Sequence, residues 1–175
     1  MGKRSSGSFE RQKRDFYPTP FSAVKPLLPH LLEKTVFDEP CAGNGALVDH
    51  LESSGHRCLR ATDIEPQRDD VGTFDAFDIE SCYGDCFITN PPWNRKFLHP
   101  LILHLCEIAP TWLLFDADWM HTRQATEYLP YCKKIVSVGR VKWIPDSPHT
   151  GKDNAAWYLF YTRTENSPVD FWGRR

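Results

Sequence analysis

Hydrophobic and polar positions follow two periodicities that alternate along the chain. Short runs rich in apolar residues, typical of strands, occur at 35–39, 58–63, 87–89 and 112–115. Between these runs, apolar residues recur three or four positions apart, which indicates amphipathic helices. Strands separated by helices predict a sheet that is mostly parallel and covered by helices on both faces. We therefore expect an α/β fold.

The N-terminal part of this pattern predicts a helix that two prolines interrupt. Thr19 followed by Pro20 is typical of a helix start, with Thr19 as the cap and Pro20 as the first helical residue. Apolar residues at helical spacing follow as far as residue 32. Pro26 and Pro29 fall among them and must kink or split the helix.

The C-terminal part of the pattern predicts the closing strands of the sheet. Strand-like runs occur at 135–138, 141–143 and 155–161, and the last two predict a hairpin. The connecting loop at 144–154 is rich in Pro, Asp, Ser, His and Gly. We expect this loop to lie beside the reactive edge of the sheet. A plain surface loop is an equally good interpretation.

A glycine-containing turn separates the first predicted strand from the helix that follows. It reads Pro-Cys-Ala-Gly-Asn-Gly over residues 40–45. Strand, glycine turn and helix form the opening unit of nucleotide-binding α/β folds. This turn has two glycines and no basic residue, which favours a nucleoside ligand without phosphates. Asp63 ends the next strand 20 residues after Gly43, where a carboxylate can hold ribose hydroxyls.

The sequence Asn90-Pro91-Pro92-Trp93 follows the central apolar run. Each proline fixes its own φ angle and restricts the residue before it to extended conformations. The segment therefore presents the Asn90 side-chain oxygen, the Pro91 carbonyl and the Trp93 ring in nearly fixed relative positions. We interpret these four residues as a catalytic segment at the end of a central strand.

This arrangement suits the transfer of a group to an exocyclic amine. The amino nitrogen of a nucleobase is a poor nucleophile because its lone pair is conjugated into the ring. Two acceptors that hold its two N–H groups favour a tetrahedral nitrogen, and they act most strongly in the transition state. Trp93 would stack on a base turned out of its helix. The alternative is a strand that ends in a proline-rich turn with a core Trp.

Three segments in this order resemble a known family. Glu-Pro-Cys-Ala-Gly-Asn-Gly-Ala-Leu (39–47), Thr-Asp-Ile (62–64) and Thr-Asn-Pro-Pro-Trp (89–93) are similar to motifs of the S-adenosylmethionine-dependent DNA amino-methyltransferases. The resemblance is strongest to the adenine-specific group, especially its small phage and prophage members. Tyr-Pro-Thr-Pro (17–20) resembles that group's N-terminal cofactor motif, and the motif order matches the gamma arrangement. The resemblance implies a Rossmann-like class I methyltransferase with a mixed seven-stranded sheet and helices on both faces.

The resemblance also implies roles for individual residues. Asn90, Pro91, Pro92 and Trp93 would form the catalytic motif. Asp75 matches the acid that contacts the cofactor's adenine amine, and Asp78 is a competing candidate. The full set of residues implied to bind S-adenosyl-L-methionine is Tyr17, Thr19, Pro20, Glu39, Cys41, Ala42, Gly43, Asn44, Gly45, Asp63, Ile64, Asp75 and Asn90. No metal is implied.

These motifs predict a methyltransferase that acts on the N6 amine of adenine in DNA. Asn90 at the first catalytic position favours adenine over cytosine. Alternative substrates are the N4 amine of cytosine, a base in RNA, and a protein glutamine. A catalytically idle cofactor-binding protein that acts through a partner is a further alternative. Protection of phage DNA from restriction by the host is a role that the resemblance implies.

Charge is distributed unevenly along the chain. The formal net charge is −2, but residues 1–14 sum to +4 and the remainder to −6. A basic arm on an acidic body favours contact with a polyanion at one place, here DNA. A solvated disordered tail is the alternative. The basic residues of the arm are Lys3, Arg4, Arg11, Lys13 and Arg14. In the loop at 144–154, His149 and Lys152, together with Trp143 just before it, are further candidate contacts.

Length and composition limit the remaining classes. The 175 residues predict one catalytic domain at 16–162, preceded by a flexible basic arm at 1–15 and followed by a tail at 163–175. A separate target-recognition domain is not expected, so we predict weak sequence preference, or recognition with the help of a second subunit in a homodimer. No apolar run is long enough to span a membrane and no signal peptide is evident, so we expect a cytoplasmic protein.

The six cysteines are expected to be reduced thiols in that compartment. The spacing of Cys82, Cys86, His99 and His104 fits a zinc-finger expression. Pro91 and Pro92 fall where a finger requires continuous hairpin and helix backbone, which argues against zinc.

Overall fold

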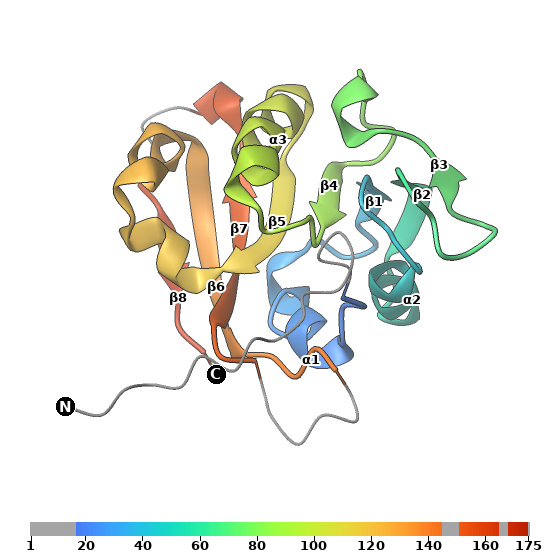
Figure 1. The fold of residues 1–175 in the computed structure, drawn as a ribbon, viewed down its shortest axis with the longest axis horizontal. Coiled ribbons are helices and arrows are strands. Elements are labelled where there is room, and N and C mark those ends of the chain that lie inside the picture. Colours follow the sequence, from blue (N-terminus) through green and yellow to red (C-terminus); the bar gives the residue numbers. More distant parts are fainter. Residues whose placement is uncertain (1–16, 145–150, 165–167, 175) are drawn as a thin grey trace.

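A computed structural model describes residues 17–144, 151–164 and 168–174 of the protein. Within them one sheet of eight strands runs through the molecule in the order β3-β2-β1-β4-β5-β7-β6-β8 (Figure 1). The strands are β1 (Val36–Glu39), β2 (Arg57–Asp63), β3 (Gly72–Thr73), β4 (Cys86–Thr89), β5 (Thr111–Asp116), β6 (Cys132–Arg140), β7 (Asn154–Phe160) and β8 (Asp170–Trp172).

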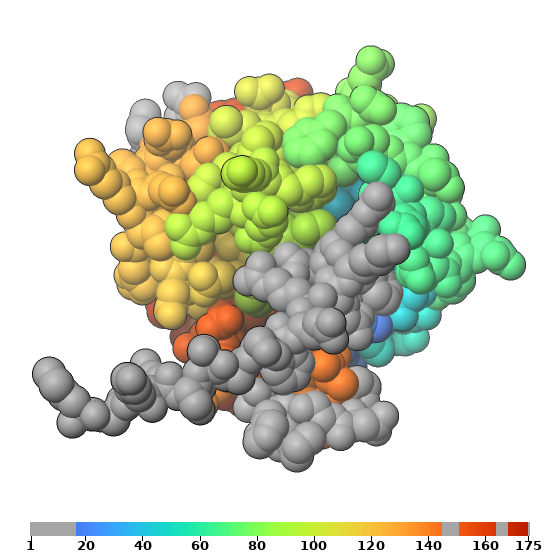
Figure 2. Space-filling view, in the orientation of Figure 1, coloured from blue at the N-terminus to red at the C-terminus, as the bar shows by residue number. Residues whose placement is uncertain are grey.

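Three α-helices and several 3₁₀ segments connect the described strands. The α-helices are α1 (Phe21–Val24), α2 (Ala46–Ser53) and α3 (Arg95–Ile108). The 3₁₀ segments are η2 (Leu28–His30), η3 (Ala76–Asp78), η4 (Ala117–His121), η5 (Arg123–Glu127), η6 (Leu129–Tyr131) and η7 (Thr162–Thr164). Figure 2 shows that the surface of α3 lies between the 117–131 segment and the segment that carries η3.

The sheet is mixed, as the sequence predicts. Strand β1 pairs in parallel with β2 and β4, and β4 pairs in parallel with β5. Strand β7 is antiparallel to both of its neighbours, β5 and β6. The predicted α/β Rossmann-like fold with a mixed sheet is therefore confirmed. The expected number of seven strands is corrected to eight, because β8 adds to the outer edge of β6.

Alternating residues of the central strands face opposite sides of the sheet. Cys86 and Ile88 of β4 pack in one cluster with buried side chains of α1 and α2. Phe87, the residue between them, packs in another cluster with buried side chains of α3. The helices therefore cover both faces, and the two-residue period of β4 carries an apolar side chain to each.

Several local predictions are corrected. Pro26 and Pro29 do split the N-terminal helix, into α1 and η2, but Thr19 makes no capping hydrogen bond, because its hydroxyl is turned to Asn90 instead. Residues 141–143 form no strand, and the hairpin partner of β7 is the longer β6.

The chain crosses the centre of the sheet between β1 and β4. From β1 it proceeds outwards to β2 and β3 and then returns to β4 on the other side of β1. Ligands of open α/β sheets bind at such a reversal of strand order, beyond the carboxyl ends of the strands. The glycine turn follows β1 and Asn90 follows β4, so both lie at this point.

Candidate active site

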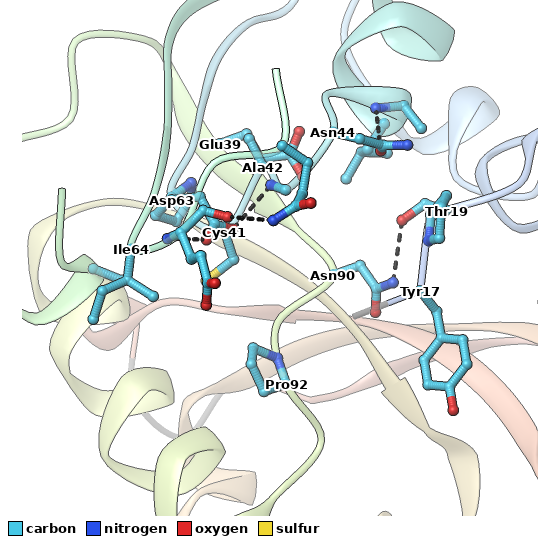
Figure 3. A pocket seen from close by; sticks show the side chains of 18 of the residues that line it. Tyr17, Thr19, Glu39, Cys41, Ala42, Asn44, Asp63, Ile64, Asn90 and Pro92 are labelled. Carbon is cyan, nitrogen blue, oxygen red and sulfur yellow. Dashed lines mark hydrogen bonds between the residues drawn. The ribbon is translucent and has the colours of Figure 1, made fainter. Parts of the chain in front are cut away.

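A cavity of about 670 Å³ opens at the carboxyl ends of β1, β2 and β4 (Figure 3). Its walls come from the N-terminal segment, the glycine turn, the loop after β2, the segment that begins η3 and the residues after β4. The residues that line it are Tyr17, Pro18, Thr19, Glu39, Pro40, Cys41, Ala42, Gly43, Asn44, Ala46, Leu47, Asp63, Ile64, Glu65, Gln67, Asp75, Ala76, Asn90, Pro92, Asn94 and Phe97. Eleven of the thirteen residues implied to bind the cofactor are in this set, and Pro20 and Gly45 are not.

The glycine turn is tied to the end of β2. The Gly43 N–H donates to Asp63 Oδ2 at 2.9 Å, and the Ala42 N–H donates to the Thr62 carbonyl at 2.9 Å. Gly43 and Gly45 have φ angles of 53° and 74°, which other residues adopt at a cost. These two bonds fix the position of the turn relative to β2 at the edge of the cavity.

Both carboxylate oxygens of Asp63 accept hydrogen bonds, and the residue also borders the cavity. While Oδ2 accepts from Gly43, Oδ1 accepts from the Glu65 N–H at 2.8 Å. Each carboxylate oxygen has a second lone pair, so the side chain can also accept from a ligand. Ile64, the next residue, is 56% exposed and lines the same cavity.

Glu39 is the most unusual group in the cavity wall. Its side chain is only 2% exposed, and its Oε2 atom has no hydrogen-bond partner within the described residues. Burial raises the pKa of Glu39 well above its usual value, and the nearby Asp63 charge raises that pKa further. An acceptor left unpaired in a cavity wall is suited to a cationic donor from a ligand.

Asp75 and Asp78, the two candidates for the adenine contact, differ in position. Asp75 lines the cavity and caps η3, where its Oδ1 accepts from the Phe77 N–H at 3.0 Å. Asp78 is exposed and does not line the cavity. The geometry therefore favours Asp75 for a ligand contact.

Asn90 borders the cavity from the side opposite the glycine turn. Figure 3 shows its side chain directed towards Thr19, with Glu39, Cys41 and Asp63 across the cavity. The Asn90 Nδ2 donates to Thr19 Oγ1 at 3.1 Å, and Asn90 Oδ1 accepts from Trp93 Nε1 at 3.2 Å. The three features that the sequence connects, namely the glycine turn, the carboxylate and Asn90, thus share one cavity.

Comparisons with known proteins bear on this geometry. No protein-family model and no curated protein sequence matches the chain. A solved structure from Pyrococcus horikoshii, described as an RNA methyltransferase, matches with a TM-score of 0.56 at 18% identity, over 87% of this chain and 90% of that chain. A dimethyladenosine transferase from Plasmodium falciparum matches with a TM-score of 0.53 at 15% identity, over 83% and 62%.

A third match is a structure from Vibrio vulnificus, described as a modification subunit of a type I restriction enzyme. It has a TM-score of 0.57 at 11% identity, and the match covers 90% of this chain and 47% of that chain. Among the described strands of this chain, β7 is antiparallel to its neighbours in an otherwise parallel sheet. The chain has the class I S-adenosylmethionine-dependent methyltransferase fold.

The predicted catalytic motif does not face this cavity as a unit. Asn90 and Pro92 line the cavity, whereas Pro91 is buried and Trp93 lies outside the lining. The Trp93 ring is half-buried and packs against the core on both faces of the sheet. It also contacts Trp143 edge-to-face, with 5.6 Å between the ring centroids. That Trp93 stacks on a base therefore stays a prediction.

Some lining residues of the methyltransferase fold carry no signal in the sequence. Gln67 and Phe97 enter the cavity wall through the loop after β2 and the first turn of α3. Asn94 could have been noticed, because an Asn just before an amphipathic helix is typical of a cap. Its Oδ1 accepts from the Lys96 N–H at 3.0 Å, while the residue also borders the cavity.

Other predicted features have separate outcomes. Within residues 17–144, 151–164 and 168–174, no group of three His, Cys, Asp or Glu side chains could hold a metal, so the zinc-finger spacing does not assemble a site there. All six cysteines are free thiols. No helix in the described part of the chain is long and apolar enough to cross a membrane. The arm at 1–15 and residues 145–150 of the loop lie outside the described residues. Most of the residues predicted to contact DNA therefore lie outside them as well.

Proposed function

We propose that this protein transfers a methyl group from S-adenosylmethionine to the N6 amine of adenine in DNA. The observation that carries the proposal is that Asn90, the glycine turn and Asp63 border one cavity. An amine held at Asn90 would therefore lie beside a cofactor bound between the turn and the carboxylate. The fold supports the same reaction class.

The residues of the cavity fit this cofactor chemically. Glu39 offers a buried acceptor without a partner, which suits the cationic methionine amine. Asp63 keeps lone pairs for ribose hydroxyls, and Asp75 can accept from an adenine amine. Among the described residues, no basic side chain lines the cavity, which suits a nucleoside that carries no phosphate.

S-adenosylmethionine, when bound, supplies an electrophilic methyl group on its sulfonium. The protein's own contribution is to hold and activate the amine. Asn90 Oδ1 and the Pro91 carbonyl would accept its two N–H groups, so that the nitrogen lone pair is released from conjugation and directed at the methyl group. The N–C bond would form as the bond from the methyl group to sulfur breaks, and S-adenosylhomocysteine would leave as a neutral thioether. The extra proton on the methylated nitrogen would then pass to water, so none of the cavity's carboxylates needs to act as a strong base.

DNA is favoured over other amine carriers by the charge distribution of the chain. The arm at 1–14 carries +4 on a body of opposite sign, and phosphate contacts of this kind supply affinity without sequence information. RNA is the second candidate, because one of the similar structures is described as an RNA methyltransferase. We expect weak sequence preference in either case.

The test is incubation of the protein with methyl-labelled S-adenosylmethionine and, in separate reactions, DNA, RNA and a protein extract. The proposal predicts label in DNA, on adenine. Label in RNA alone would support the second candidate, and label on cytosine or on protein would replace the proposed substrate. No incorporation despite cofactor binding would identify an idle binding protein.

A further inference from the structure

The indole N–H of Trp93 is shared between two oxygens. Trp93 Nε1 donates to Asn90 Oδ1 at 3.2 Å and to the Leu114 carbonyl at 3.1 Å. Leu114 belongs to β5, the strand beside β4, so Trp93 links the catalytic residue to the neighbouring strand. Trp143 meets the Trp93 ring edge-to-face at an interplanar angle of 87°, which limits rotation of the indole.

This contact determines which end of the Asn90 amide is the oxygen. An indole N–H is a donor only, and an amide has one accepting and one donating end. With the amide reversed, the NH₂ group would face the Trp93 N–H and two donors would oppose each other. The Thr19 hydroxyl accepts from Nδ2 at the other end, so both ends of the amide have a partner.

We propose that Trp93 is a positioning residue that orients the Asn90 oxygen for the methyl acceptor. This inference rests on the proposed function and assigns to Trp93 a role other than stacking. Asn90 Oδ1 has two lone pairs, so one remains for the amine when the indole takes the other. The amide is thereby fixed before substrate binds, and binding energy is not spent on turning it.

Trp93→Phe separates the two roles, because it keeps an aromatic face and removes only the N–H. We expect kcat to fall by ~10- to 100-fold, by analogy with the loss found when a hydrogen-bond partner that orients a metal ligand is removed. The KM values for cofactor and DNA should change little. The matched control is Trp157→Phe, which also removes an indole N–H from a backbone carbonyl, that of Ala23 at 2.8 Å. It should lower the melting temperature without lowering kcat.

Asn90→Asp supplies the second arm of the test. A carboxylate presents oxygen at both ends and needs no orientation, so Trp93→Phe should cost much less in that background. An equal loss in both backgrounds, or a Trp93→Phe enzyme within twofold of the wild-type kcat, would overturn the inference. If Asn90→Asp is itself inactive, the Asn90 side-chain NH₂ signals in ¹⁵N NMR decide: they should shift and broaden in Trp93→Phe, and unchanged signals would overturn it. A wild-type protein that transfers no methyl group refutes the proposed function instead.

Discussion

Thr19 and Asn90 are joined by a hydrogen bond across 71 residues of sequence. Asn90 Nδ2 donates to Thr19 Oγ1 at 3.1 Å, and Thr19 is only 6% exposed. The bond attaches the segment before α1 to the end of β4. It gives the nitrogen end of the amide a partner, while the oxygen end accepts from Trp93. The N-terminal segment is therefore bonded to Asn90 and also forms a wall of the cavity.

Thr19→Val should reduce turnover while it preserves the fold. Valine has the shape of threonine but cannot accept from Asn90, so the amide loses one of its two fixed ends. We expect a smaller loss of kcat than for Asn90→Ala, and a free energy of unfolding lower by about 1 kcal/mol, the net value of one hydrogen bond. Thr19→Ser should retain both. Steady-state kinetics and urea unfolding measure the two effects, and a valine variant with unchanged kcat would remove this bond from the mechanism.

Glu39→Gln should stabilise the cofactor-free protein as pH rises. The pKa of Glu39 is raised in the folded state, chiefly by burial, so the folded protein keeps a proton that the unfolded chain releases. This stabilising contribution is complete below the ordinary glutamate pKa of 4.5 and is lost as pH rises through the folded-state pKa. Glutamine does not titrate, so the stability of the variant relative to wild type should increase from about pH 4.5 upwards.

Urea unfolding of both proteins at several pH values, without cofactor, measures this difference. The same substitution should weaken binding of S-adenosylmethionine at neutral pH, because it removes the anionic form of the acceptor. Calorimetric titration would show this as a higher Kd. A stability difference that does not depend on pH would mean that Glu39 titrates normally in the folded protein.

Asp75→Asn should weaken cofactor binding more than Asp78→Asn does. Only Asp75 lines the cavity. Its asparagine variant can still cap η3 through the side-chain oxygen, so a change in affinity would report the ligand contact rather than the fold. Asp78→Asn is the matched control on the same 3₁₀ turn. Equal affinities of the two variants, measured by titration with cofactor, would remove Asp75 from the site.

Deletion of residues 2–14 should weaken DNA binding and flatten its dependence on salt. Each phosphate contact that is lost reduces the slope of log K against log salt concentration by about 0.9 for duplex DNA. Cofactor affinity is the control and should not change, because the variant keeps every described residue that lines the cavity. Fluorescence anisotropy at several salt concentrations measures the slope, and an unchanged slope would exclude the arm from DNA contact.

Local patterns along the chain were sufficient for the order of the central elements and for the strand ends that border the cavity. Asp63 and Asn90 could be assigned to strand ends because each follows a short apolar run, and parallel strands bring such ends to one edge. The extra strand β8 could not be foreseen, because three residues carry little intrinsic preference and this strand exists only through pairing with β6.

The side-chain contacts of the site depend on tertiary packing that sequence patterns do not contain. Thr19 before Pro20 matches the local pattern of a helix cap, yet its hydroxyl accepts a hydrogen bond from Asn90 and does not cap α1. Trp93 matches a stacking residue by its position in the motif, yet its N–H is directed at Asn90 and Leu114. The bond from Asn90 to Thr19 and the bond from Trp93 to Leu114 each join segments that are far apart in the sequence.

The central claim is that Asn90 activates an adenine amine for methyl transfer. Its most direct measurement is nucleoside mass spectrometry of DNA from cells that express either the wild-type protein or Asn90→Ala. The account predicts N6-methyladenine with the wild type and none above background with the variant, whose purified form still binds S-adenosylmethionine. N6-methyladenine at equal levels with both proteins, or its absence from the DNA of cells that express active wild-type protein, would contradict the account.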